Sequence, residues 1–210
     1  MANPFHYSKI KHSRTQTPPV YGNYRRYKSE LRTEFGSQCV YCRAVDRIKG
    51  IENFGVDHYR PQKHFPTLAT EYLNLYYSCN RCNSLKRDFW PSPQRARDGQ
   101  FVPNPCDHVM FDHLRYKKGT VADVSSAGAW TVELLDLNDP NVVQFRESVI
   151  GIVDMLLGHI QTATNTVGEA EKAAANANTP EQKITTSEFL AKAQIQLAES
   201  QRILNNFVGP

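Results

Sequence analysis

The sequence predicts an α+β fold. Two Cys-x-x-Cys pairs, Cys39/Cys42 and Cys79/Cys82, enclose two short strand patterns, and a short helix pattern follows them. Further along lie the pattern of a short hairpin and two long amphipathic helix patterns. Cysteines paired at this spacing are typical of a structural metal site that holds short elements together.

The charge of the chain is unevenly distributed. At 210 residues the chain can bury the core of one domain or one and a half. Residues 1–118 carry 20 Lys and Arg against 10 Asp and Glu, whereas residues 119–210 carry 5 against 11. We therefore expect a basic region, 1–118, suited to a polyanion such as nucleic acid, and an acidic region, 119–210, with another role. An ordinary solvated surface is the alternative explanation.

The sequence shows no sign of a membrane protein or a secreted protein. No apolar run approaches the roughly 18 residues of a membrane helix. The first six residues lack a charged segment followed by an apolar core, so we expect no secretory signal. We expect a cytoplasmic protein, and in a reducing cytosol paired cysteines are more often metal ligands than disulfides.

The basic region contains an arm, a helix and the cysteine-enclosed motif. Residues 1–23 have no clear period and predict an irregular arm. From Tyr24 to Phe35, apolar and aromatic residues recur every three or four positions, which predicts a basic helix that stops at Gly36. We then expect one strand at residues 56–59 and a second at residues 73–78. A short helix is expected to follow the last cysteine and to end at about Asp88.

The acidic region begins with a predicted hairpin and ends in helices. Its strands are expected at residues 119–122 and 130–134, with the turn at 125–128. Asn138-Asp139-Pro140 is a helix start. Helical patterns over 142–167 and 181–207, broken at Thr179-Pro180, predict an antiparallel helical hairpin.

The four paired cysteines predict a closed tetrahedral Zn²⁺ site at Cys39, Cys42, Cys79 and Cys82. Four ordinary buried cysteines are the alternative. The fifth cysteine, Cys106, has two histidines nearby, but a lone cysteine in this setting is more often a packed thiol than a ligand. The sequence leaves open the roles of Cys106, His108 and His113.

Asp57 and His58 lie between the cysteine pairs. Adjacent residues on a strand point to opposite faces, so one can coordinate a hard divalent cation while the other faces a water molecule. Hydrolysis of a phosphodiester calls for such a cation and for a base that takes a proton from water. Carboxylate and amide oxygens favour Mg²⁺ or Mn²⁺, and a neutral imidazole is a suitable base.

Taken together, these motifs resemble the zinc-clamped HNH endonuclease family, which has the ββα-metal or His-Me finger fold. The resemblance covers about residues 37–90. It is carried by the two Cys-x-x-Cys pairs, Val-Asp-His-Tyr-Arg-Pro, Tyr-Leu-Asn-Leu and Cys-Asn-Arg-Cys-Asn-Ser-Leu-Lys. A literal H-N-H motif would have His where this chain has Asn83.

The resemblance implies roles for individual residues. His58 would be the general base, and Asn74 would brace the loop between the two strands. Asp57 and Asn83 would hold the catalytic Mg²⁺ or Mn²⁺. Contacts to substrate phosphates are expected from Arg60, Lys86 and Arg87.

Four further segments are Asp-His-Tyr-Arg-Pro-Gln-Lys, Asn-Leu-Tyr-Tyr-Ser-Cys, Asn-Pro-Cys at residues 104–106 and Leu-Asp-Leu-Asn before the helical tail. They resemble standalone bacterial anti-phage HNH proteins of the Septu type, which work beside an ATPase partner. The resemblance implies a DNA endonuclease whose acidic helical region docks a partner; a region that only completes the core is the alternative. Two other functions remain possible from the sequence. One is a non-catalytic zinc-knuckle module that binds nucleic acid, and the other is an interaction protein that acts through its helical tail.

Overall fold

A computed structural model describes residues 4–208 of the chain. The first three residues of the expected arm and the last two of the expected helical region lie outside the described residues. Backbone contacts divide the described chain into two compact units, residues 4–148 and residues 149–208. The expected boundary at residue 118 differs from this division, because residues 118 and 119 form the turn of a hairpin inside the first unit.

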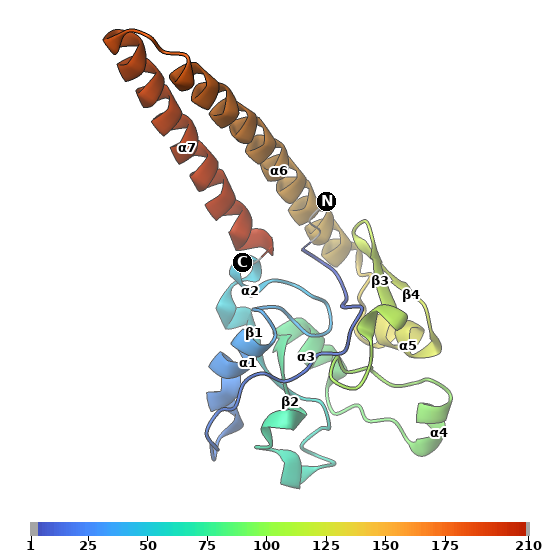
Figure 1. Cartoon of the computed structure of the whole chain (residues 1–210). Coiled ribbons are helices and arrows are strands. Elements are labelled where there is room, and N and C mark those ends of the chain that lie inside the picture. The colour runs from blue at the N-terminus through green and yellow to red at the C-terminus, as the bar shows by residue number, and fades with distance from the viewer. Residues whose placement is uncertain (1–3, 209–210) are drawn as a thin grey trace. The chain divides into compact units, whose positions relative to one another are not determined.

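The first unit combines short helices with two small antiparallel sheets, as expected for an α+β fold (Figure 1). Its elements in chain order are η1 (Tyr24–Tyr27), α1 (Lys28–Glu34), α2 (Asp46–Lys49), η2 (Ile51–Asn53), β1 (Phe54–His58), η3 (Pro66–Leu68), η4 (Tyr72–Asn74), β2 (Leu75–Cys79), α3 (Asn80–Lys86), α4 (Pro93–Arg97), η5 (Met110–Asp112), β3 (Leu114–Lys117), β4 (Thr120–Asp123), α5 (Ser126–Leu134) and the beginning of α6 (Pro140–Ala175). The η elements are 3₁₀ turns. The second unit contains the rest of α6 and α7 (Pro180–Val208).

The β1–β2 sheet and α3 form the centre of the first unit. The strands pair antiparallel, with Asp57 opposite Tyr76 and His58 opposite Leu75. Both strands lie close to their expected positions. The helix begins earlier than expected, because Cys79 keeps an extended backbone at the N-cap and α3 starts at the next residue. Cys82 therefore lies inside the helix rather than before it.

The expected hairpin at residues 119–134 is wrong. The observed hairpin pairs β3 with β4 through a turn at Lys118 and Gly119, where Lys118 has a φ of 56°. Residues 126–134 form helix α5 because the Ser125 side chain caps it, accepting a hydrogen bond from Gly128 N. A Cβ atom at Gly128 would lie 2.0 Å from the carbonyl oxygen of His113. Helix α5 therefore packs so closely against the backbone of His113 that only glycine fits at this position.

The core of the first unit is rich in aromatic side chains. The helix expected at residues 24–35 is present as η1 followed by α1, and it buries Tyr27, Leu31 and Phe35. Phe35 stacks on Tyr76 of β2 with ring centroids 5.4 Å apart. Such pairs bring large apolar areas together and stabilise the contact of α1 with the sheet.

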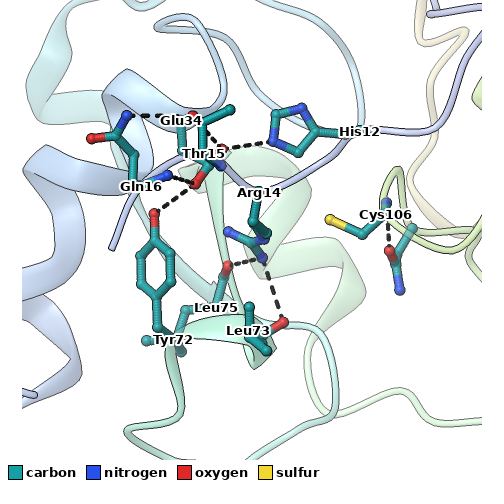
Figure 2. A network of polar contacts seen from close by, with 10 residues as sticks. His12, Arg14, Thr15, Gln16, Glu34, Tyr72, Leu73, Leu75 and Cys106 are labelled. Atoms are coloured by element: carbon teal, nitrogen blue, oxygen red, sulfur yellow. Dashed lines mark hydrogen bonds and ion pairs between the residues drawn. The ribbon is translucent and has the colours of Figure 1, made fainter. Parts of the chain in front are cut away.

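The arm before η1 has no helix or strand over residues 4–23, as expected, but it is held against the first unit by side-chain contacts. Glu34 of α1 accepts hydrogen bonds from the backbone N–H of Thr15 and Gln16, from His12 and from the Tyr72 hydroxyl (Figure 2). The arm also donates from Arg14 to the carbonyl oxygens of Leu73 and Leu75, at 3.4 and 2.8 Å (Figure 2).

The carboxyl group of Glu34 makes the attachment of the arm sensitive to acid. Burial raises the pKa of this group, but the hydrogen bonds from Gln16, Thr15 and His12 outweigh burial and lower the pKa to about 2. A lowered pKa in the folded state stabilises the protein above the ordinary pKa of 4.5, and this stability is lost as the pH falls from 4.5 towards 2. The contribution is at most about 3 kcal/mol.

We expect Glu34→Gln to lower the free energy of unfolding at pH 7, because an amide cannot accept all of these bonds. The difference between the variant and the wild type should shrink as the pH falls from 5 to 3. Urea unfolding of both proteins at several pH values measures this difference. Other groups that titrate in both proteins change the two stabilities equally, so their effect cancels in the difference. A difference that stays constant over this pH range would show that the carboxylate contributes nothing.

The two long helices begin close to where the sequence predicts them, but α6 continues to Ala175, whereas its helical pattern was expected to end at residue 167. Asp139 caps α6 by accepting hydrogen bonds from the N–H groups of Asn141 and Val142. At the start of α7, Thr179 and Gln182 form a reciprocal capping box. From the short connection at residues 176–179 the helices run in opposite directions, as expected (Figure 1).

The apolar faces of these helices are only partly buried. Val153, Leu156 and Ala193 are buried, whereas Ile152 and Phe189 are 38% and 47% exposed. No helix in the described part of the chain is both long and apolar enough to cross a membrane.

Candidate active site and metal centre

The four paired cysteines come together in one buried cluster. Cys39 and Cys42 lie in the loop before α2, Cys79 ends β2, and Cys82 belongs to α3. Their sulfur atoms all lie within 4.8 Å of one another. The Sγ atoms of Cys42 and Cys79 are 3.7 Å apart, close to the edge of about 3.8 Å that a tetrahedral zinc site with Zn–S bonds of about 2.3 Å requires.

The protonation of these thiols also suits a metal cation. Hydrogen bonds from Cys39, Cys79 and Cys82 lower the pKa of Cys42, whereas burial raises the pKa of Cys39. The cluster therefore cannot ionise all of its thiols by itself, and a bound cation would supply the charge that four thiolates need. The cluster is compatible with the expected zinc site.

Asp57 and His58 lie at the end of β1, and the strand turns their side chains to different environments, as expected. Asp57 is 3% exposed and points into the core, whereas His58 is half-buried.

Two neighbours orient the imidazole of His58. Its Nε2 atom lies 2.9 Å from the carbonyl oxygen of Ala69. A carbonyl oxygen can only accept, so Nε2 carries the hydrogen and Nδ1 is the free acceptor of the neutral ring. The ring of Tyr24 meets the imidazole edge-on, with centroids 4.6 Å apart. The tautomer of His58 is therefore set for a base that acts through Nδ1.

Asn74 holds the loop between the two strands. Its side-chain oxygen accepts from the backbone N–H of Arg60 at 2.9 Å, and its side-chain nitrogen donates to the carbonyl oxygens of Arg60 and Leu68 at 3.0 and 3.2 Å. Because Ala69 follows Leu68 directly, the amide of Asn74 also holds in place the residue that orients His58.

Both carboxylate oxygens of Asp57 are engaged by side chains of the chain itself. The hydroxyl of Tyr41 donates to Oδ2, and burial raises the pKa of Tyr41, so this phenol stays protonated. The ammonium of Lys86 lies 3.1 Å from Oδ1 and donates to the carbonyl oxygen of His58 at 2.7 Å.

The expected phosphate contact by Lys86 is therefore wrong. Its side chain is only 1% exposed, and its ammonium points into the core because Asp57 provides a buried counter-charge there. The other two expected contacts, Arg60 and Arg87, are exposed. Arg60 lies 5.8 and 5.7 Å from the rings of Phe65 and Trp90.

Asn83 lies in α3, directly after Cys82, and is half-buried. It precedes Lys86 by three positions, so the two side chains lie on the same face of the helix. In residues 4–208, Asp57 belongs to no group of three or more His, Cys, Asp or Glu ligands. The environment of Asp57 nevertheless suits a cation, because the carboxylate already holds the ammonium of Lys86. The carboxylate of Asp57 and the side-chain oxygen of Asn83 are ligand types that suit Mg²⁺ or Mn²⁺, with water or phosphate oxygens completing the set.

Three residues near the site were not predicted from the sequence. Tyr41 lies between the first two cysteines, and that position was the signal that could have revealed it. Tyr24 begins the helix predicted from the recurring apolar and aromatic residues of Tyr24 to Phe35, a pattern that does not indicate a contact with His58. Ala69 acts through its backbone, and no residue type indicates such a contact.

Cys106, His108 and His113 do not join the cysteine cluster. The backbone N–H of Cys106 donates to the side chain of Asn104, and Nδ1 of His113 lies 2.7 Å from Oγ of Ser125. The two histidine rings are 5.4 Å apart. Within the described residues these side chains form no candidate metal site of three or more ligands.

Comparison with known proteins gives matches to one domain family and to two relatives. A family model described as HNH endonuclease matches residues 39–89. Two curated relatives are both named Septu protein PtuB. The relative from Bacillus mycoides (strain KBAB4) is 22% identical over 155 residues, which cover 61% of this chain and 52% of the relative. The relative from Bacillus thuringiensis is 30% identical over 118 residues, which cover 55% and 42%.

The chain thus spans about half the length of the curated relatives it matches. No solved structure gives a significant match.

Proposed function

We propose that this chain is a metal-dependent endonuclease that hydrolyses phosphodiester bonds of DNA, because a model of the HNH endonuclease family matches residues 39–89. The observation that carries the proposal is the orientation of His58. Its Nε2–H is bound to Ala69, so Nδ1 remains free to take a proton from a water molecule.

Each site residue then has a defined task. His58 removes a proton from the attacking water through Nδ1. Asn74 keeps the loop that orients the imidazole in place. Asp57 and Asn83 would hold Mg²⁺ or Mn²⁺, which when bound neutralises charge on the scissile phosphate. The exposed guanidinium groups of Arg60 and Arg87 contact neighbouring phosphates.

The similarity to the Septu protein PtuB sequences supports a role in bacterial anti-phage defence. We propose that the protein acts in the cytoplasm with an ATPase partner. We propose further that this partner docks on the acidic helices of residues 149–208, whose exposed apolar side chains include Met155, Ile184, Phe189 and Ile195.

Cleavage of plasmid and phage DNA by the purified protein with Mg²⁺ or Mn²⁺ tests the nuclease function, both alone and with proteins co-purified from the native host. We expect His58→Ala to slow cleavage by about 10²- to 10⁴-fold, because a positioned general base contributes this much. His64→Ala is a matched control, since His64 is exposed in the loop that follows β1.

Equal cleavage by wild type and His58→Ala would contradict the mechanism. DNA binding without cleavage under every condition would instead indicate a non-catalytic zinc-knuckle module. A protein that neither binds nor cuts DNA but retains its partner would indicate that the helical tail carries the function.

A further inference from the structure

We propose that Lys86 is the internal counter-ion of the nuclease site, whose ammonium occupies the Asp57 carboxylate until a catalytic cation displaces it. The inference rests on the proposed function, in which Asp57 holds that cation. It adds a positioning residue that also sets the affinity of the site for metal.

The burial of the pair carries the first step. The side chains of Lys86 and Asp57 are 1% and 3% exposed, so both charges are removed from water. Two charges buried together persist only when each finds its partners inside the protein. The ammonium finds two, the Oδ1 atom of Asp57 and the carbonyl oxygen of His58, at 3.1 and 2.7 Å.

These contacts connect α3 to the end of β1. The ammonium of Lys86 donates both to the carboxylate of Asp57, the expected metal ligand, and to the backbone carbonyl oxygen of His58, the expected base. Lys86 therefore holds the two adjacent residues in register with the helix that carries Asn83. Because Tyr41 occupies the other carboxylate oxygen, Asp57 is fully engaged in this arrangement.

A divalent cation at Asp57 and Asn83 would meet this ammonium at close range. Asn83 and Lys86 are three residues apart on one face of α3, and the ammonium of Lys86 lies 3.1 Å from Oδ1 of Asp57. Like charges repel strongly in a poorly solvated site. A metal ion that binds at Asp57 must therefore either displace the ammonium of Lys86 or bind despite the repulsion between the two positive charges. In both cases the site binds metal more weakly than it would if the carboxylate of Asp57 had no ammonium beside it.

Isothermal titration of the full-length, zinc-loaded protein with Mn²⁺ tests the inference. We expect Lys86→Met, which keeps the unbranched side chain and removes the charge, to bind Mn²⁺ at least about tenfold more tightly. Lys86→Arg should bind it within about threefold of wild type, because the charge remains. A folded Lys86→Met variant with unchanged or weaker affinity would overturn the proposal.

The reactivity of lysines in the wild-type protein gives a second measurement that needs no folded variant. With reductive methylation and mass spectrometry, Lys86 should be protected without added cation and become reactive in saturating Mn²⁺. Lys63, which is exposed, should react in both states. Continued protection of Lys86 when titration shows Mn²⁺ bound would reject the displacement.

Asp57→Asn separates this inference from the proposed function. If Mn²⁺ binding does not depend on Asp57, the assignment of the metal site fails and the counter-ion proposal fails with it. If binding requires Asp57 but is unaffected by the charge at Lys86, only the counter-ion proposal fails. A loss of binding in Asp57→Asn, with tighter binding in Lys86→Met, supports both.

Discussion

Removal of zinc from the cysteine cluster should unfold the nuclease domain and abolish cleavage of DNA. The four cysteines join the loop before α2, the end of β2 and the first turns of α3, and all four are buried. Structural zinc sites contribute about 10–16 kcal/mol of apparent binding free energy, which exceeds the whole stability of many domains. A strong zinc chelator should eliminate the near-ultraviolet circular dichroism, and adding Mg²⁺ should not restore it.

Cys82→Ser should produce the same loss without a chelator, because three thiolates leave the site incomplete. Cys106→Ser is the matched control, since Cys106 lies outside the cluster and should retain one zinc per chain and an unchanged melting temperature. Native protein without zinc by elemental analysis, or a chelated protein with an unchanged spectrum, would contradict the prediction.

Arg146→Met should destabilise the protein by about 3–5 kcal/mol. The Arg146 side chain is among the largest that are fully buried, with 1% exposure. Its guanidinium donates to the carbonyl oxygen of Gly119 at 2.6 Å and to that of Leu137, and it lies over the ring of Tyr116. Methionine fills similar space but leaves two buried carbonyl oxygens without this donor.

Urea unfolding monitored by circular dichroism measures this loss. Lys117→Met is the control, because Lys117 is exposed on β3 and its replacement should change stability by less than about 0.5 kcal/mol. A change of under 1 kcal/mol in Arg146→Met would mean that water satisfies the two carbonyl groups equally well.

The parts of the fold that local sequence determines were predictable. The spacing of Cys39, Cys42, Cys79 and Cys82 indicates a metal cluster because few other arrangements need thiols at those intervals. The same holds for the starts of α6 and α7, because Asp139 and Thr179 cap the helices through their own neighbours. These signals act within a few residues and do not depend on the rest of the chain.

The error at residues 119–134 has the opposite cause. Trp130-Thr131-Val132 is rich in residues that favour strands, but Ser125 caps a helix there, and close packing of Gly128 against His113 stabilises it. Sequence reasoning weighted the strand propensity and overlooked the cap. The contact with His113 depends on the folded chain and has no local signal.

The site shows the same division. His58 and Asn74 were predicted because their residue types suit the proposed chemistry, and in the structure Asn74 holds the loop whose Ala69 carbonyl oxygen binds His58. Lys86 was expected to contact substrate phosphates at the surface, because lysine is rarely buried. The carboxylate of Asp57 becomes the counter-charge of Lys86 only when α3 packs against β1. This packing is a tertiary contact that the local sequence does not reveal.

The position of Tyr41 connects the cysteine cluster to the candidate site. This residue lies between two cysteines of the cluster, and its hydroxyl donates to Asp57. Under the proposed zinc assignment, loss of the metal would release Tyr41 from this position and leave one carboxylate oxygen of Asp57 without its donor.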